Sequence, residues 1–174
     1  MAKELDLKKF IRDIPDFPKK GIVFKDITPL LKDKNAFKAS IDGLAKAFKD
    51  KKIDAVVAVE SRGFIFGAAL AHQLGVGFIP VRKKGKLPYK TKSVTYQLEY
   101  GTDTLEIHED AVGPGVKVLI IDDVLATGGT LKGVADLLKV QKAEIVGVGF
   151  VIELGFLKGR EKLAGLDVNA LIRY

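Results

Sequence analysis

Residues 118–130 read Val-Leu-Ile-Ile-Asp-Asp-Val-Leu-Ala-Thr-Gly-Gly-Thr, and this stretch indicates both a fold class and a kind of site. The four apolar residues 118–121 are typical of a buried parallel strand. The small and hydroxylic residues 127–130 come just before a segment of helical periodicity. Free backbone amides and the positive end of a helix dipole bind phosphate well. Asp122 and Asp123 add carboxylates that suit sugar hydroxyls, or a magnesium ion with its waters.

The rest of the chain alternates between strand and helix patterns. We expect strands at 53–59, 77–81, 116–121, 145–152 and 166–172, and helices at 5–11, 64–74 and after residue 130. Asn35 is expected to cap a further helix. Gly75 is expected to end the helix at 64–74, and Gly101 is expected to lie in the turn of an antiparallel hairpin. Strands that alternate with helices predict a parallel α/β sheet whose ligands lie beyond the carboxyl ends of the strands. No repeat or linker divides the 174 residues, so we expect a single domain.

Composition narrows the class of protein. Apolar residues make up 47% of the chain, which is typical of a globular protein and argues against disorder. The absence of cysteine excludes disulfides and thiolate chemistry, and is compatible with a reducing cytosol. No apolar run approaches the ~20 residues that span a bilayer, and no secretory apolar segment follows the charged N-terminus. We therefore expect a cytoplasmic protein without a membrane partner.

The net charge of +7 raises nucleic acid as a partner, but the pattern of charge favours a smaller anion. The main basic cluster is interrupted by Gly85 and Pro88, so it indicates a loop and not a basic helix; it consists of Arg82, Lys83, Lys84, Lys86, Lys90 and Lys92. No aromatic-rich strand of the RNA-binding type accompanies it. A pyrophosphate group suits this loop better than a duplex does, and a solvated lysine-rich loop remains the alternative.

A second short loop, Glu60-Ser61-Arg62-Gly63-Phe64, also follows an expected strand and begins a helix. It offers backbone amides with a guanidinium beside them, which is a second arrangement for binding an anion. The alternative is an ordinary helix start in which Ser61 caps the helix and Arg62 is merely exposed. Because no Gly-x-Ser-x-Gly motif surrounds Ser61, we do not expect serine catalysis.

These stretches resemble the type I phosphoribosyltransferases. Residues 118–130 are similar to the motif that binds phosphoribosyl pyrophosphate, and residues 60–64 to the pyrophosphate loop of the adenine-specific members. The resemblance covers nearly the whole chain, through residues 15–18, 21–30, 82–83, 85–88 and 98–101. It implies a parallel sheet flanked by helices, a flexible antiparallel hairpin at about 91–108 and a small N-terminal hood at 1–34.

The resemblance also implies a reaction. The phosphoribosyl group would pass from phosphoribosyl pyrophosphate to adenine, as in purine salvage, and would yield AMP and pyrophosphate. The implied cofactor is Mg²⁺, which the diphosphate would carry and water would link to Asp122 and Asp123. A homodimer is implied as well. In chemical terms, pyrophosphate leaves ribose C1′ through an oxocarbenium-like state and adenine N9 attacks.

Residue roles follow from the same resemblance. The phosphoribosyl group would contact Asp122, Asp123, Ala126, Thr127, Gly128, Gly129 and Thr130, and the pyrophosphate would contact Glu60, Ser61, Arg62, Arg82, Lys83, Lys86 and Tyr100. Adenine would lie against Val23, Phe24 and Lys25, either at the Lys25 side chain or at its backbone. Glu99 would be the catalytic carboxylate, as a proton acceptor or as an electrostatic stabiliser of the cationic sugar.

Several alternatives stay open at this point. Val23 and Phe24 are also compatible with plain core packing, and Glu99 with an exposed strand position. A regulatory protein on the same fold would need a DNA-binding module, for which the residues before Gly21 are too few, and would lose the loop glutamate. A dinucleotide-binding oxidoreductase is disfavoured because no Gly-x-Gly-x-x-Gly motif follows a strand. Transfer to hypoxanthine, guanine or xanthine is the main alternative within the enzyme class.

Overall fold

The computed structural model describes residues 5–97 and 101–174. The chain forms two compact units, Met1–Gly43 and Leu44–Tyr174. In its described part the first unit holds a 3₁₀ turn, η1 (Leu7–Phe10), and an antiparallel pair of strands, β1 (Arg12–Pro15) and β2 (Val23–Asp26). Two helices follow, α1 (Thr28–Lys32) and α2 (Lys34–Ala47).

Local hydrogen bonds explain where the elements of the first unit begin. The expected helix at 5–11 is only the 3₁₀ turn, because the chain then enters β1 and pairs with β2. Asp33 caps α2, since its Oδ1 accepts the backbone N–H groups of Asn35 and Ala36 at 2.9 Å each. The prediction that Asn35 is the cap was therefore wrong by two positions. Aspartate binds the free amides of a first helical turn as well as asparagine does.

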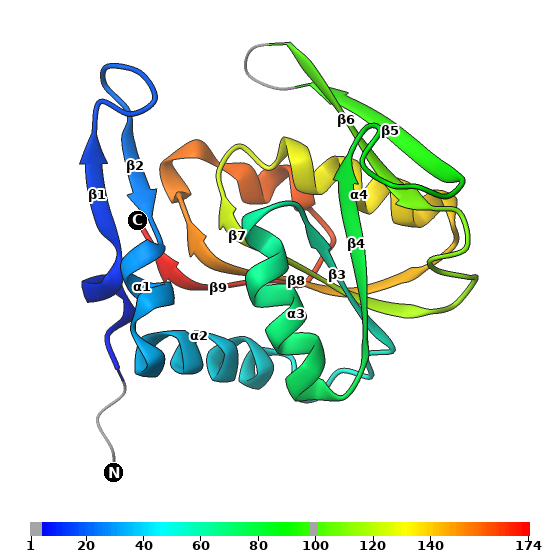
Figure 1. The fold of residues 1–174 in the computed structure, drawn as a ribbon, viewed down its shortest axis with the longest axis horizontal. Coiled ribbons are helices and arrows are strands. Elements are labelled where there is room, and N and C mark those ends of the chain that lie inside the picture. Colours follow the sequence, from blue (N-terminus) through cyan, green and yellow to red (C-terminus); the bar gives the residue numbers. More distant parts are fainter. Residues whose placement is uncertain (1–4, 98–100) are drawn as a thin grey trace. The chain divides into compact units, whose positions relative to one another are not determined.

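The second unit is built on a seven-stranded sheet (Figure 1). Its strands are β3 (Ala55–Val59), β4 (Gly77–Lys83), β5 (Thr91–Gln97), β6 (Thr102–His108), β7 (Lys117–Leu125), β8 (Glu144–Glu153) and β9 (Val168–Arg173). Their order is β5-β6-β4-β3-β7-β8-β9, and the strands from β4 to β9 pair in parallel. The hairpin β5–β6 adds to the edge in antiparallel fashion. The predicted fold class is confirmed.

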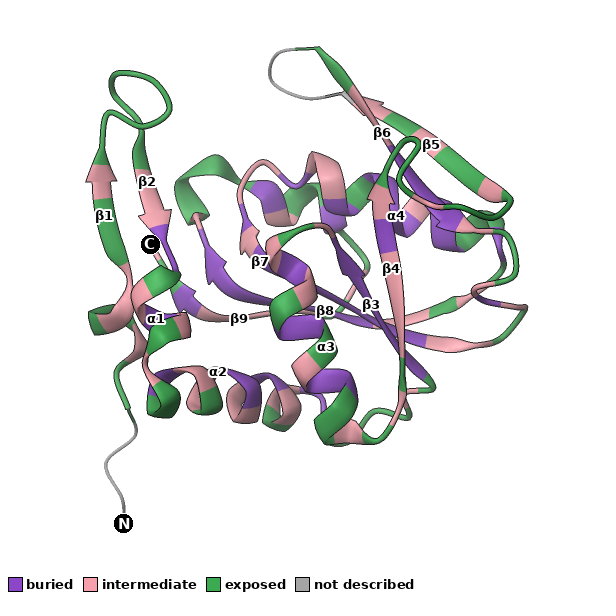
Figure 2. Ribbon diagram, in the orientation of Figure 1, coloured by how far each residue is buried: buried purple, intermediate pink, exposed green. Residues whose placement is uncertain are grey.

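Helices α3 (Arg62–Leu74) and α4 (Gly129–Val140) cover opposite faces of this sheet. On one face Gly67 of α3 lies so close to β3 that an added Cβ would be 2.5 Å from the Cβ of Ala58. On the other face Val57 and Val59 belong to one apolar cluster with Val134 of α4. Figure 2 shows β3 and most of β7 as buried, as expected for strands covered on both faces.

Strand β7 continues through Leu125, beyond the expected end at Ile121. Its pairing with β8 includes Asp122 opposite Phe150 and Val124 opposite Ile152, so the acidic pair lies within the sheet and not in the loop. The sequence pattern misplaced this end because charged residues interrupt the apolar run. The predicted helix end was right, because Gly75 adopts a left-handed conformation with φ 68° and ends α3.

The neighbouring strands β3 and β7 form a topological switch point. The chain leaves β3 into α3 on one face and leaves β7 into α4 on the other, so the two connections diverge at the carboxyl ends of these strands. Open α/β sheets bind ligands in the crevice that such a divergence leaves. After β8 two 3₁₀ turns follow, η2 (Gly155–Leu157) and η3 (Gly159–Leu163). None of the helices in the described part of the chain is long and apolar enough to cross a bilayer.

Candidate functional site

A cleft of about 430 Å³ lies at the carboxyl ends of β3 and β7. Its lining combines residues from both loops and from the hairpin: Val59, Glu60, Ser61, Arg62, Lys83, Tyr96, Asp103, Leu105, Asp122, Asp123, Val124 and Thr130. A smaller cavity of about 70 Å³ shares Asp122, Val124 and Thr130 with it, and is otherwise lined by residues 125–129 and Leu131. The two loops that the sequence singled out therefore meet in one place.

The smaller cavity sits where β7 ends and α4 begins, at residues 126–130, which we call the phosphate loop. Gly128 precedes α4 in a left-handed conformation with φ 77°, which favours glycine. No side chain in the described ranges caps this helix, so the N–H groups of its first turn remain for a ligand. An anion would be bound there by these amides and by the helix dipole.

Asp122 and Asp123 carry negative charge at the edge of this loop. Asp123 is only 4% exposed, and its Oδ2 lies 2.8 Å from Nε of Arg62, which joins the loop after β3 to β7. Burial raises the pKa of Asp122 well above its ordinary value, and the neighbouring charge of Asp123 raises it further. Burial also raises the pKa of Asp123, although Arg62 works in the opposite direction. Both carboxylates would gain from donors that replace lost hydration.

Glycine at position 63 lets α3 begin against this acidic pair. A Cβ at Gly63 would lie 2.7 Å from Oδ1 of Asp122 and 3.2 Å from the carbonyl oxygen of Ile121. The same oxygen of Asp122 accepts the backbone N–H of Asp123 at 2.9 Å. A side chain at residue 63 would therefore displace a carboxylate that lines the cleft.

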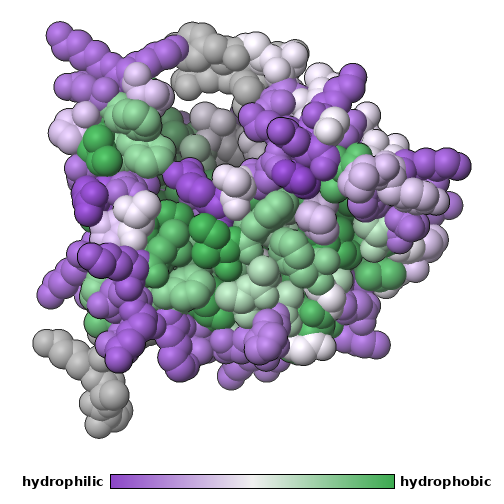
Figure 3. Space-filling model, in the orientation of Figure 1, coloured by the Kyte–Doolittle hydropathy of each residue, from purple (hydrophilic) through white to green (hydrophobic). Residues whose placement is uncertain are grey.

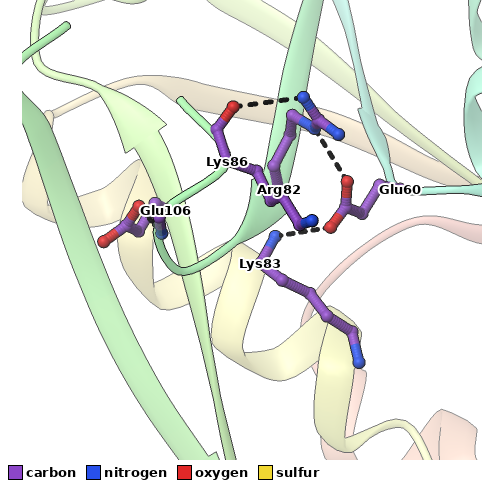
Figure 4. Close-up of polar contacts among 6 residues, drawn as sticks. Glu60, Arg82, Lys83, Lys86 and Glu106 are labelled. Atoms are coloured by element: carbon purple, nitrogen blue, oxygen red, sulfur yellow. Dashed lines mark hydrogen bonds and ion pairs between the residues drawn. The ribbon is translucent and has the colours of Figure 1, made fainter. Parts of the chain in front are cut away.

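The opposite wall of the cleft is basic, and Glu60 organises it (Figure 4). Glu60 Oε2 accepts a hydrogen bond from Arg82 Nε at 2.7 Å, and Oε1 accepts one from the backbone N–H of Lys83 at 3.0 Å. Arg82 Nη1 in turn donates to the carbonyl oxygen of Lys86 at 3.1 Å. Burial opposes ionisation of Glu60, but these hydrogen bonds outweigh it and lower its pKa. The Glu60 side chain thus orients Arg82 and Lys83. The peptide bond between Glu60 and Ser61 is cis.

Two polar residues of the hairpin line the cleft and a third supports its basic turn, although the sequence did not single them out. Asp103 Oδ2 lies 3.1 Å from Nζ of Lys83, and this hydrogen bond raises the pKa of Lys83. Burial raises the pKa of Tyr96, while its interaction with the side chain of Thr130 in the phosphate loop lowers it. Glu106 accepts the backbone N–H of Gly85 at 2.9 Å and so holds the basic turn.

The only sequence signal for two of these residues was strand alternation. Tyr96 and Asp103 are direct cross-strand partners, which places them on one face of the hairpin. Two further residues, Glu99 and Tyr100, lie outside the described residues, so their roles stay predictions.

The residues predicted to contact adenine lie in the first unit, on β2. Val23 is 46% exposed, which speaks against plain core packing at that position. The Phe24 ring meets Phe17 edge to face, with ring centroids 5.3 Å apart. Lys25 Nζ lies 2.7 Å from Oδ1 of Asp13, and its side chain is only 11% exposed. Val23 therefore offers an exposed apolar side chain and Phe24 an aromatic ring, whereas the ammonium group of Lys25 is already paired with Asp13.

Comparison with known proteins agrees with this geometry. Residues 28–164 match the family model described as phosphoribosyl transferase domain. A relative from Thermotoga sp. strain RQ2, named adenine phosphoribosyltransferase, is 59% identical over 98% of this chain and 100% of its own length. The adenine phosphoribosyltransferase structure from Thermoanaerobacter pseudethanolicus has a TM-score of 0.94 and 57% identity, and covers 97% of this chain and 98% of its own.

A third match comes from Saccharomyces cerevisiae. That adenine phosphoribosyltransferase structure contains an imino-altritol bisphosphate and adenine; its TM-score is 0.89 at 44% identity, over 95% of this chain and 96% of its own. The chain therefore belongs to the phosphoribosyltransferase family, and within it to the adenine phosphoribosyltransferases.

Proposed function

We propose that this transferase moves the phosphoribosyl group of phosphoribosyl pyrophosphate to adenine, which yields AMP and pyrophosphate as in purine salvage. The observation that carries the proposal is one cleft with an amide-rich phosphate loop and acidic pair on one side and a cluster of cations on the other. A sugar with a phosphate at one end and a diphosphate at the other matches this polarity. The yeast relative binds a bisphosphate and adenine together.

The 5′-phosphate would lie on the phosphate loop, against the amides of Ala126, Thr127, Gly128, Gly129 and Thr130. The hydroxyls of Thr127 and Thr130 add donors. The ribose hydroxyls would donate to Asp122 and Asp123, and support comes from the burial of both carboxylates, since hydroxyl donors would replace the hydration that burial removed.

The diphosphate would lie on the opposite side of the cleft. Ser61 and Lys83 line the cleft there, Arg62 lines it beside Asp123, and Glu60 orients Arg82, which in turn bonds to the backbone of Lys86. These cations would neutralise negative charge that grows on pyrophosphate as it leaves C1′. Tyr100 belongs to the proposal on the resemblance alone.

The carboxylates that line the cleft fit Mg²⁺. This ion keeps several waters and binds through one or two carboxylates together with substrate phosphates. Asp122 and Asp123 offer two carboxylates, and no group of three ligating side chains occurs among the residues described. When bound, magnesium would add positive charge against the leaving diphosphate.

Adenine would lie against Val23 and Phe24, because an apolar and aromatic surface suits a neutral planar base. The Lys25 ammonium is paired with Asp13, which favours recognition of adenine through the Lys25 backbone over its side chain. Glu99 would act as the catalytic carboxylate. It would either stabilise the cationic ribose or accept the proton that adenine loses when N9 attacks C1′.

Turnover of single bases tests the proposal. Purified protein with phosphoribosyl pyrophosphate and magnesium should convert adenine faster than hypoxanthine, guanine or xanthine, and removal of magnesium with EDTA should abolish turnover. Faster use of another base would refute the adenine assignment. A protein that binds phosphoribosyl pyrophosphate but turns over no base would favour the regulatory alternative.

We further propose a homodimer in the cytoplasm. Apolar side chains gather over α3 and β4 on one face of the second unit (Figure 3), and Ile65 of α3 is 40% exposed. Exposed apolar patches often mark contacts between proteins. Sedimentation of the wild type and of Ile65→Glu tests this: a wild-type dimer that the substitution dissociates is expected, and a wild-type monomer would refute it. The lack of cysteine is compatible with a reducing compartment, which cell fractionation would check.

A further inference from the structure

The backbone of the phosphate loop is in direct contact with η3, the 3₁₀ turn that follows β8. A Cβ at Gly159 would lie 2.1 Å from the carbonyl oxygen of Ala126 and 2.9 Å from the backbone nitrogen of Gly128. A Cβ at Gly128 would lie 2.3 Å from the carbonyl oxygen of Gly159. Because the two main chains touch, only glycine fits at both positions. The turn η3 therefore supports the phosphate loop through direct contact between their backbones.

Arg160 anchors this support to the end of β8. Its Nε and Nη2 donate to Oε1 and Oε2 of Glu153 at 2.9 Å and 2.6 Å, and its Nη1 donates to the carbonyl oxygen of Val168 at 2.7 Å. Glu153 is only 7% exposed, and the Arg160 hydrogen bonds lower its pKa. A two-point arginine–carboxylate pair fixes orientation as well as distance. Neither side chain lines the cleft.

The other end of η3 is fixed by packing. Leu163 is 2% exposed and belongs to the same apolar cluster as Leu131, in the first turns of α4. Arg160 and Leu163 thus hold the turn that begins at Gly159, the first through an ion pair and the second through the core. Such a support leaves the backbone of the phosphate loop no room to move towards η3.

We propose that Gly159 and Arg160 are positioning residues for the 5′-phosphate. The pair Arg160–Glu153 holds Gly159 against Ala126 and Gly128, and this contact sets the direction of the amides that receive the phosphate. Binding by fixed amides requires that they be held in place before the ligand arrives. This inference rests on the proposed function, which assigns the phosphate loop to the 5′-phosphate.

Calorimetric titration with two separate ligands tests the proposal. Ribose 5-phosphate reports on the phosphate loop, and inorganic pyrophosphate with magnesium reports on the basic side of the cleft. The variants are Gly159→Ala, which introduces the clash, and Arg160→Gln, which releases the anchor. Each should weaken ribose 5-phosphate binding by roughly tenfold or more, because displacement of binding groups by about 1 Å has effects of this size. Pyrophosphate affinity should stay within about twofold of wild type.

Matched controls separate positioning from general damage. Gly113→Ala adds a Cβ to open space, and Arg173→Gln removes the other guanidinium that contacts Glu153, at 3.1 Å, without releasing η3. Both controls should bind ribose 5-phosphate as the wild type does. If Gly159→Ala does not fold, Arg160→Gln carries the test, and it should raise KM for phosphoribosyl pyrophosphate more than it lowers kcat.

The outcomes are distinguishable. Normal ribose 5-phosphate affinity in the folded variants would overturn the positioning role and leave the proposed function intact. An equal loss of affinity for ribose 5-phosphate and for pyrophosphate would also overturn the positioning role, because Gly159 and Arg160 would then stabilise the second unit as a whole. A wild type that binds pyrophosphate but not ribose 5-phosphate would refute the assignment of the phosphate loop itself, and with it this inference.

Discussion

Replacing Asp122 by asparagine should make the protein more stable and a poorer enzyme at the same time. Asp122 lies half-buried in β7, and burial together with the neighbouring charge of Asp123 raises its pKa well above the ordinary 3.8. An ionised carboxylate there costs folding free energy. Asparagine removes the charge and keeps an oxygen that can accept the Asp123 N–H, which Asp122 Oδ1 accepts at 2.9 Å.

The size of the stability gain follows from this environment. A single stabilising substitution typically adds about 0.5–2 kcal/mol, and at a destabilised active site it does so at the expense of function. For a chain of this length each kcal/mol moves Tm by about 2–4 °C, so we expect an increase of roughly 1–8 °C. The cost falls on substrate use. Loss of a charged acceptor for a hydroxyl or a metal-bound water should lower kcat/KM for phosphoribosyl pyrophosphate by roughly tenfold to a hundredfold.

The stability difference between Asp122→Asn and the wild type should depend on pH in a defined direction. The folded-state pKa of Asp122 is raised, so the contribution of this side chain to folding is most favourable below pH 3.8, where it is protonated in both the folded and the unfolded state. That stability is lost as pH rises through the folded-state pKa. The advantage of Asp122→Asn should therefore be large at neutral pH and shrink towards pH 3.8.

Thermal unfolding without ligand, over a series of pH values, measures this effect. Asp167→Asn is a suitable control, because the Asp167 side chain is exposed and pairs with Lys51 in a surface contact of 2.8 Å. The reasoning would be refuted if Asp122→Asn were no more stable than wild type at neutral pH, or if its advantage did not depend on pH.

Two further predictions concern the hairpin. Asp103→Asn removes the partner of Lys83, so the pKa of Lys83 should fall towards its ordinary value and the ammonium group should be freer to bind the diphosphate. Titration should show phosphoribosyl pyrophosphate binding up to about fivefold tighter, which is the range for an exposed ion pair. Weaker binding would contradict competition between Asp103 and the substrate for Lys83. Glu99→Leu, outside the described residues, should lower the single-turnover rate about a hundredfold or more with little change in substrate affinity, and an unchanged rate would exclude a catalytic role.

The strands and the cleft could be predicted because they depend on local patterns. Apolar runs marked β3 and β7, and their position in a parallel sheet placed both loops at one edge. Gly75 gave a reliable helix end because its left-handed conformation is a local requirement. The end of β7 was misplaced for a physical reason: Asp122 and Asp123 keep their places in the sheet through pairing with β8, which no local pattern encodes.

Contacts between distant segments were not predictable from the sequence. Lys83 meets Asp103 only because β4 and β6 are neighbours at the sheet edge. Gly159 was one of 18 glycines in the sequence, and nothing nearby indicated that its missing side chain admits the backbone of Ala126. Such contacts depend on how the whole unit packs, and become visible only in three dimensions.

Crystallography of the protein with phosphoribosyl pyrophosphate and magnesium tests the central claim most directly. Density for the 5′-phosphate should lie on the amides of residues 127–130, with the ribose hydroxyls at Asp122 and Asp123. The diphosphate should lie beside Arg62 and Lys83, whose side chains line the same cleft. Density for the sugar diphosphate in the reverse direction, or at a site away from the carboxyl ends of β3 and β7, would contradict the account.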